Sequence, residues 1–416
     1  MAEKILANHS VPHKESVSPG EYIWAKVDAT NIMAAPRILD AFRKLGVGVF
    51  DPDRIFAVDD HDSPPQNIAA AEAVADMEKF VKEYGIKHWF EYGRHGIQHQ
   101  LFPENGYCVP GDLIVMMDSH STTYGAFNAA SSPIAEELPY VLAKGQLWFR
   151  VPHSIKFWLE GTLPPMCVGK DVILKIAGDY GTDVGLYKSV EFLGPLAEQM
   201  KLSDRWTIAN MGIEIGAKFA LFEADQKTSD FLKGRADRSF KPVSSDSDAT
   251  YEHEYEFNAT YLEPMVACPH DPGNSKPARE VEKEKIKIHQ ALLGTCTNAR
   301  MDDLHMAARI LKGRKVHPDV KLIVSPSSME VWREALKGGV LDMLVESRGC
   351  IVQPTCGPCY GGHTGVLGAG QRCISTGPRN FQGRMGSPQS EVYLANAATV
   401  AASAIAGEIV DPRRYE

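Results

Sequence analysis

Three short apolar runs in the first 120 residues constrain the fold most, because each leads into a cluster of polar side chains. The runs predict buried strands at residues 55–58, 88–91 and 113–117. Residues 68–84 carry apolar side chains at helical spacing, and strands that alternate with helices are typical of an α/β protein with a mostly parallel sheet. In open α/β sheets, ligands bind beyond the carboxyl ends of the strands. We therefore expect the polar clusters at residues 59–61, 94–99 and 118–121 to line one cleft.

Changes in composition along the chain suggest three α/β domains, at residues 1–165, 166–284 and 285–416. Residues 225–284 are rich in Ser, Asp, Pro and Lys with little periodicity, and they predict a long surface excursion at the end of the second domain. The third domain begins with a predicted strand at residues 286–293, and a helix follows it. Residues 349–370, rich in Gly, Pro and Cys, predict a loop.

Composition excludes several classes of protein. The chain has 416 residues, is 44% apolar and 23% charged, and carries a formal charge of −9, which argues for a globular protein and against a nucleic-acid partner. The first residues do not resemble a signal peptide, and no apolar run approaches the roughly 18 residues of a membrane span. Eight cysteines are too few for a disulfide scaffold. We expect a cytoplasmic protein.

Three cysteines offer metal-binding thiolates. Cys296 lies in Gly-Thr-Cys-Thr-Asn, and Cys356 and Cys359 lie in Pro-Thr-Cys-Gly-Pro-Cys-Tyr-Gly. An iron-sulfur cube held by three thiolates keeps one iron open, and an open iron can act as a Lewis acid. The spacing alone also fits a dithiol redox pair, or a zinc site whose fourth ligand comes from Cys350, His363 or Cys373.

Together with other motifs, these cysteines resemble the aconitase superfamily and, within it, the family of 3-isopropylmalate dehydratase large subunits. The resemblance covers nearly the whole chain. The motifs that carry it, besides the three cysteines, are Asp118-Ser119-His120, Asn210 to Glu214, and residues 110–112, 147–152, 169–174 and 379–387. It implies three aconitase-type α/β domains around a central, cluster-containing cleft, without the mobile fourth domain of single-chain aconitases.

The resemblance also implies a role for each site residue. One 4Fe-4S cluster per chain would be held by Cys296, Cys356 and Cys359, with its fourth iron open. The catalytic residues would be Asp60, His61, His99, Asp118, His120 and Glu214, with His61 as the acid and Glu214 contacting water on the iron. The substrate-binding residues would be Ser119, Asn210, Arg379 and Arg384. A carboxylate beside an imidazole fixes its tautomer and raises its pKa, and a guanidinium binds carboxylates with two hydrogen bonds.

The implied function is that of the large subunit of a hydro-lyase, which dehydrates and isomerises a substituted malate. The first candidate substrate is 3-isopropylmalate, which would place the chain in leucine biosynthesis. Homocitrate-, citramalate- and 2,3-dimethylmalate-type substrates remain alternatives, because one methylene changes binding by only about 1–3 kcal/mol. A small subunit with the mobile domain would supply the base. Alternatives from other classes are a binding or regulatory relative without catalysis, and a zinc-stabilised scaffold.

Two segments depart from the family pattern. Pro378 stands where an Asn precedes the Arg-Asn of residues 379–380, and a proline ring cannot donate a hydrogen bond. Residues 128–137 replace a Gly-rich run by bulkier side chains. A change at either place is expected to alter the cluster or the substrate preference. His95 and His363 lack matching motifs, and we expect both to be structural or peripheral.

Overall fold

The computed structural model describes residues 1–236 and 238–416, which form two compact units. Unit 1 comprises residues 1–92, 101–160 and 185–257, and unit 2 comprises residues 93–100, 161–184 and 258–416. Both units therefore assemble from segments that are distant in the sequence. The division into domains that end at residues 165 and 284 stays a prediction.

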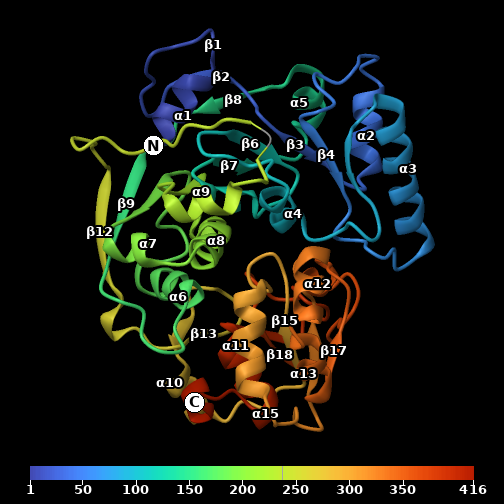
Figure 1. The fold of residues 1–416 in the computed structure, drawn as a ribbon, viewed down its shortest axis with the longest axis vertical. Helices are drawn as coiled ribbons and strands as arrows, with labels where there is room; N and C mark the ends of the chain where they lie inside the picture. Colours follow the sequence, from blue (N-terminus) through green and yellow to red (C-terminus); the bar gives the residue numbers. More distant parts are fainter. Residues whose placement is uncertain (237) are drawn as a thin grey trace. The chain divides into compact units, whose positions relative to one another are not determined.

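Unit 1 contains four small sheets (Figure 1). Its strands are β1 (Ser10–Val11), β2 (Tyr22–Lys26), β3 (Thr30–Ile32), β4 (Ile55–Val58), β5 (His88–Phe90), β6 (Leu113–Met116), β7 (Ala130–Pro133), β8 (Gln146–Arg150), β9 (Ser154–Glu160), β10 (Ser189–Leu193), β11 (Phe219–Phe222) and β12 (His253–Asn258). The sheet orders are β1-β2-β8, β3-β4-β5, β6-β7 and β11-β10-β9-β12. Within the second and third of these sheets the strands pair in parallel, as do β9, β10 and β11 in the fourth.

Helices cover these sheets and enclose two apolar cores. The helices of unit 1 are α1 (Ala2–His9), α2 (Pro36–Arg43), α3 (Ile68–Tyr84), η1 (Ser121–Phe127), α5 (Leu138–Lys144), α7 (Pro195–Gln199), α8 (Leu202–Asn210), η2 (Met211–Ile215) and α9 (Gln226–Leu232), and α4 (Gln98–Glu104) begins in unit 2 and ends in unit 1. Figure 1 shows α2 and α3 beside β4, where Phe42, Phe80 and Ile55 are fully buried in one core. The Asn67 side chain caps the start of α3, and Gly85 ends it in a left-handed conformation.

Unit 2 is built on one seven-stranded sheet in the order β14-β13-β19-β18-β15-β16-β17. Its strands are β13 (Met265–Ala267), β14 (Ser275–Pro277), β15 (Gln290–Leu293), β16 (Lys321–Val324), β17 (Gly349–Ile351), β18 (Arg372–Ser375) and β19 (Glu391–Ala395). The five strands from β19 to β17 run in parallel, and β13 joins β19 in the antiparallel sense. Consequently the carboxyl ends of β15, β16 and β18 share one edge of the sheet.

The helices of unit 2 pack on this sheet and bury its main apolar core. They are α6 (Gly169–Tyr180), η3 (Ala259–Tyr261), α10 (Ala278–Val281), η4 (Glu282–Glu284), α11 (Met301–Leu311), α12 (Met329–Lys337), α13 (Val340–Glu346), α14 (Gly357–Tyr360), α15 (Ala397–Ala406) and η5 (Pro412–Tyr415). Asn396 and Ser328 cap α15 and α12 through their side-chain oxygens. Among the described residues, no helix combines the length and apolarity needed to cross a membrane.

The local predictions are confirmed for the strands near residues 55, 88 and 113 and for the helix at residues 68–84. The predicted surface excursion at residues 225–284 stays a prediction as a whole, although its described residues include α9, β12, β13, β14 and α10, and three of these elements join sheets. β13 and β14 have only three residues each, too few to show a clear alternation, and they are stabilised by pairing with each other and, for β13, with the distant β19. The predicted loop at residues 349–370 likewise contains β17 and α14, and the strand expected at residues 286–293 forms only at its end.

Candidate active site

The predicted acid-base residues of unit 1 lie directly after strands. Asp60 and His61 follow β4, and His61 Nδ1 lies 2.7 Å from Asp60 Oδ1. Asp60 is almost fully buried, whereas the His61 side chain is partly exposed. Because the buried carboxylate accepts the Nδ1 proton, the imidazole presents its Nε2 atom, which lies 3.6 Å from Asp118 Oδ2. This geometry suits a proton donor.

A second histidine belongs to the same network. His120 donates its backbone N–H to Asp118 Oδ1 at 2.7 Å, and its Nε2 lies 3.0 Å from Glu214 Oε1. Both His120 and Glu214 are buried, and the Ser119 hydroxyl lies 3.4 Å from His120 Nδ1. One carboxylate, that of Asp118, therefore connects the two histidines, and the buried Glu214 contacts the His120 ring.

Close packing of two 3-10 helices brings Glu214 to His120. Asn210, the last residue of α8, donates its amide to Thr123 Oγ1 at 2.8 Å, which ties η2 to η1. A Cβ atom on Gly125 would lie 1.7 Å from the carbonyl oxygen of Ala220, so only glycine lets η1 approach β11 this closely. Asn210 was expected to bind substrate, and in the structure its amide supports this packing.

The three predicted cluster cysteines lie in unit 2 and are buried. Cys296 follows β15, Cys356 precedes α14 and Cys359 lies within it. All three are 6–7% exposed and none forms a disulfide. Cys296 and Cys356 pack with Ile97 in one small apolar cluster. The structure therefore brings thiols from two distant segments together.

Histidine 99 lies in the segment of unit 2 that holds Ile97. It is 1% exposed and sits in the first turn of α4. The backbone N–H of Ile97 donates to Ser327 O at 2.8 Å, which anchors this segment at the start of α12. His95 accepts a hydrogen bond at Nδ1 from the backbone of Gly93, and burial lowers its pKa, so it is a neutral structural histidine.

Basic side chains surround the thiols. Arg384 donates from Nη2 to Cys359 Sγ at 3.3 Å, and Arg300 donates from Nη2 to the carbonyl oxygen of Cys296 at 3.1 Å. Lys170, fully buried in α6, donates to the carbonyl oxygens of Thr376 and Gly377 at 3.1 and 2.6 Å. Burial lowers the pKa of Lys170 to about 7. Positive charge near a thiol favours the thiolate that a metal needs.

Arg379, the other predicted substrate-binding arginine, has a different environment. Its guanidinium lies 5.8 Å from the ring centre of the exposed Phe381. The neighbouring Asn380 is fully buried, and its amide donates to Cys268 O at 2.7 Å. Pro378 has no side-chain amide. The amide of Asn380, two residues later, therefore holds the backbone of Cys268.

Comparison with known proteins places the chain in a family. A model of the aconitase family (aconitate hydratase) matches residues 3–407. The chain is 47% identical to the 3-isopropylmalate dehydratase large subunit 1 of Pyrococcus furiosus, covering 99% of this chain and 98% of that protein. It is 46% identical to the 3-isopropylmalate dehydratase large subunit of Aquifex aeolicus, covering 99% and 96%. The chain belongs to the aconitase family.

A solved structure supports the fold of this aconitase-family chain. The holo form of aconitase X from Thermococcus kodakaraensis superposes with a TM-score of 0.51 at 10% identity, covering 85% of this chain and 84% of that one. The predicted aconitase-type α/β fold is confirmed. The predicted family and its assignment to the hydro-lyases are confirmed as well.

The donor set of unit 2 fits the 4Fe-4S cluster that the aconitase family implies. Three buried thiols with adjacent guanidinium and ammonium groups can hold an iron-sulfur core. The candidates for a fourth zinc ligand have other surroundings than the three buried thiols. Cys350 is exposed, and burial raises the pKa of the Cys373 thiol to about 12, which disfavours a thiolate there. The His363 ring nitrogens lie 3.4 and 2.6 Å from the Thr355 and Thr364 hydroxyls.

Three further residues near these sites were missed from the sequence. Burial, and then the charge of Asp60, raise the pKa of Asp59 to about 7. Nothing in the run Asp59-Asp60-His61 distinguishes the carboxylate of Asp59 from that of Asp60. Lys170 lies in a stretch, residues 169–174, that is fully buried in the structure, and a lysine among such residues is unusual. Arg300 gave no comparable signal.

Residues 128–137, which differ from the family pattern, begin inside unit 1. Asn128 is fully buried, and its amide donates to the carbonyl oxygens of Phe222 and Val243 at 2.9 Å each. Residues 130–133 form β7, which pairs with β6. The first part of the segment is therefore packed within the fold, where Asn128 anchors the segment that holds Val243, whereas residues 135–137 are exposed.

Proposed function

We propose that this chain is the large, cluster-bearing subunit of a dehydratase that acts on a substituted malate, with 3-isopropylmalate as its substrate. The observation that carries the proposal is the similarity to 3-isopropylmalate dehydratase large subunits, which runs over 99% of the chain at 44–48% identity. The acid-base network of unit 1 and the three thiols of unit 2 both support catalysis.

The proposed cofactor is one 4Fe-4S cluster on Cys296, Cys356 and Cys359. When bound, it would supply a Lewis acid to the hydroxyl and a carboxylate of the substrate. Arg300 orients the Cys296 backbone and Arg384 holds the Cys359 sulfur, so the chain's own cations balance the thiolate charge. Lys170 fixes the backbone at residues 376–377, directly before Arg379.

Proton transfer is assigned to unit 1. Asp60 holds Nδ1 of His61, so that Nε2 carries the proton that goes to the departing hydroxyl. Asp118, 3.6 Å from that atom, stabilises the protonated ring. Glu214, 3.0 Å from His120 Nε2, orients the His120 ring beside Asp118. We assign His99 a catalytic role as well, because the family resemblance implies it.

Substrate carboxylates are assigned to Arg379 and Arg384, because a guanidinium can grip a carboxylate with two parallel hydrogen bonds. Ser119 would donate its hydroxyl to the substrate, and Asn210 would act by holding η2 in place. The base that removes the carbon-bound proton is proposed to come from a small subunit with a mobile domain. The relatives are named as large subunits, which implies such a partner for them.

Anaerobic purification with and without a co-expressed small subunit tests this function. We expect about four irons and four sulfides per chain, and hydration of the unsaturated isopropyl diacid only when the small subunit is present. A panel of homocitrate-, citramalate- and 2,3-dimethylmalate-type substrates separates the remaining candidates. Zinc without sulfide would support the scaffold alternative, and a cluster without activity on any diacid would support a binding or regulatory role. The cluster's need for a reducing compartment agrees with a cytoplasmic location.

A further inference from the structure

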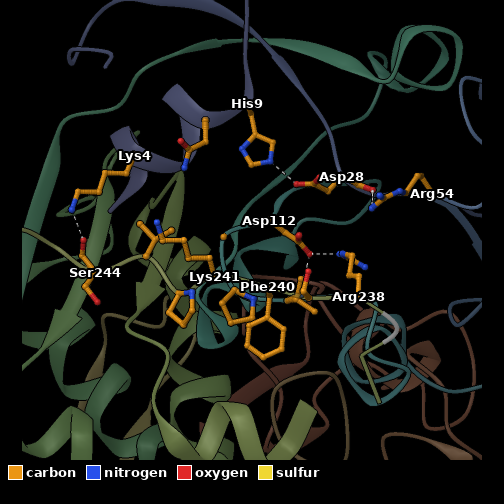
Figure 2. Close-up of a pocket in the computed structure, with 16 residues that line it drawn as sticks. Lys4, His9, Asp28, Arg54, Asp112, Arg238, Phe240, Lys241 and Ser244 are labelled. Atoms are coloured by element: carbon orange, nitrogen blue, oxygen red, sulfur yellow. Dashed lines mark hydrogen bonds and ion pairs between the residues drawn. The ribbon is translucent and has the colours of Figure 1, made fainter. Parts of the chain in front are cut away.

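A cavity of about 480 Å³ in unit 1 is lined mostly by polar and basic residues that the proposed reaction does not use. It lies among the end of α1, the segment before β6 and residues 238–244 (Figure 2). The basic residues among its described lining are Lys4, His9, Arg54, Arg238 and Lys241, and the acidic ones are Asp28 and Asp112. Basic groups thus outnumber acidic groups here, although the whole chain carries a formal charge of −9.

Both carboxylates of the cavity are already neutralised by the protein. Asp28 Oδ2 accepts from the backbone N–H of Leu113 at 2.8 Å and from His9 Nε2 at 2.6 Å. Asp112 Oδ2 accepts from the backbone N–H of Val109 at 2.9 Å and from Arg238 Nη2 at 2.5 Å. Figure 2 shows both ion pairs as dashed lines. These carboxylates serve the fold, so they do not make the cavity a cation site.

His9 is positively charged in this setting. Its Nδ1 lies 2.7 Å from the carbonyl oxygen of Ile5, and its Nε2 faces Asp28, so both ring nitrogens donate. Burial opposes the charge, but the bond to Asp28 raises the pKa of His9 overall. The His9 ring and the Ser10 hydroxyl, which donates to Ala7 O at 2.7 Å, thus place donors at the last turns of α1, where they reduce the negative potential of the helix terminus.

The remaining cations have donors to spare. Lys241 is exposed and makes no ion pair or hydrogen bond within the described part of the chain. Arg54 makes one long bond of 3.4 Å to the carbonyl oxygen of Asp28 and an ion pair of 4.0 Å with Asp51, and the rest of its five N–H donors are available. A lysine and an arginine that line one cavity can together bind a small anion with two charges.

The walls are held in place before any ligand binds. Val243 donates its backbone N–H to Asn128 Oδ1 at 2.7 Å and receives the Asn128 amide at its carbonyl oxygen. Lys4 donates to Ser244 O at 2.9 Å and forms an ion pair with Asp246 at 2.6 Å. On Gly111 a Cβ would lie 3.0 Å from Lys241 O, so the two walls approach closely. Preorganised donors lower the entropic cost of binding. The departure from the family pattern at Asn128 thus supports this cavity.

We propose that the cavity formed by Lys4, His9, Arg54, Arg238 and Lys241 binds a small dianion of the phosphate or dicarboxylate class. The site is separate in its residues from the proposed acid-base network, and the proposal does not depend on the substrate of the reaction. Phosphate and a dicarboxylate each carry two negative charges, which Arg54 and Lys241 would bind.

Calorimetric titration of the cluster-loaded, full-length chain tests the proposal, with inorganic phosphate, malonate and chloride as probes at equal ionic strength. We expect saturable binding of phosphate or malonate, and the tighter of the two names the class. Lys241→Glu should weaken that binding at least about tenfold, and Arg54→Gln should weaken it in the same direction. Lys82→Glu changes an exposed lysine on α3 and should leave the Kd unchanged.

Two results would overturn the site. One is that neither dianion binds the unmodified chain more tightly than chloride does. The other is that Lys241→Glu and Lys82→Glu give the same Kd, which would place the observed binding elsewhere, including at the proposed substrate site. Because Lys241 is exposed, its substitution leaves the fold intact, and circular dichroism of each variant verifies this.

Discussion

At the scale of single residues, the surroundings of each carboxylate decide which proton it holds. The buried carboxylate of Asp60 lies 2.7 Å from the His61 ring, whereas the neighbouring Asp59 accepts the backbone N–H of Asp62 at 3.3 Å. Burial and the nearby Asp60 charge therefore raise the pKa of Asp59 to about 7. Two adjacent aspartates thus take different roles.

His61→Ala tests the proton donor. We expect the variant to retain iron, sulfide and the absorption of the cluster, and to lose about 10²- to 10⁴-fold in kcat, because a positioned general acid contributes about that much. The assay uses the complex with the small subunit. His253→Ala removes an exposed imidazole of the same unit and should be as active as the unmodified enzyme. Normal turnover by His61→Ala would show that another residue is the acid.

Asp59→Asn tests the raised pKa through stability. The folded chain holds the Asp59 proton more tightly than the unfolded chain, so the stability from this group is full below about pH 4 and is lost as pH rises through about 7. The variant should therefore gain about 1–3 kcal/mol in unfolding free energy at pH 8 relative to the unmodified chain, and little at pH 4.

Urea unfolding at both pH values measures this difference, with the exposed Asp248→Asn as the control. An equal effect of Asp59→Asn at pH 4 and pH 8 would contradict the raised pKa. The amide keeps an oxygen for the Asp62 N–H, so the local turn is preserved.

At the scale of elements, short strand-to-helix turns deliver the functional groups. Cys296 follows β15. Cys356 directly precedes α14, a helix of only four residues, and Cys359 lies within it. The turn around α14 closes on the His363 ring, since a Cβ on Gly357 would lie 2.2 Å from that ring. Hydroxyls of Thr355 and Thr364 hold the ring on both sides, which leaves it little room to move.

Gly357→Ala should therefore disturb the thiol-bearing turn. We expect the variant to assemble less than half as much cluster as the unmodified chain, because about 1–3 kcal/mol of overpacking must be relieved by moving the turn. Sulfide per chain after anaerobic purification is the measurement. Gly48→Ala, where a Cβ meets no atom within 4 Å, is the matched control. Full cluster content in Gly357→Ala would show that His363 moves aside freely.

At the scale of the whole molecule, each unit has its own apolar core, apart from the thiols. The main core of unit 2 joins its sheet to α11, α13 and α15, while Cys296, Cys356 and Ile97 form a small separate cluster. The thiols thus lie at the carboxyl edge of a sheet that is stabilised without them.

Cys356→Ser should abolish the cluster and spare the fold. Since the residue lies outside the main core, the unfolding free energy of the cluster-free chain should change by less than about 1 kcal/mol. Circular dichroism and sulfide content of the variant, next to the exposed-site control Cys350→Ser, give the comparison. Wholesale unfolding of Cys356→Ser would mean that the metal is structural.

Sequence patterns were sufficient wherever a signal is local. The runs that became β4, β6 and α3 are apolar or periodic over their own lengths, so no tertiary information was needed to predict them. The three thiols and the Asp-His pair stood out in the same way, since their residue types carry the chemistry and the motifs around them resemble one family. Family, fold class and the hydro-lyase assignment followed from the residues alone.

Only the tertiary structure decided what depends on distant partners. The short strands β13 and β14 form because they pair with β19 and with each other, and residues 225–284 alone do not indicate this. The burial that raises the pKa of Asp59 and the burial of Lys170 both depend on how the chain packs around them. The same holds for the cavity around Lys241, whose walls are over 100 residues apart in sequence. Desolvation and ion pairing depend on the distances between groups in the folded chain, and the order of residues in the sequence does not give those distances.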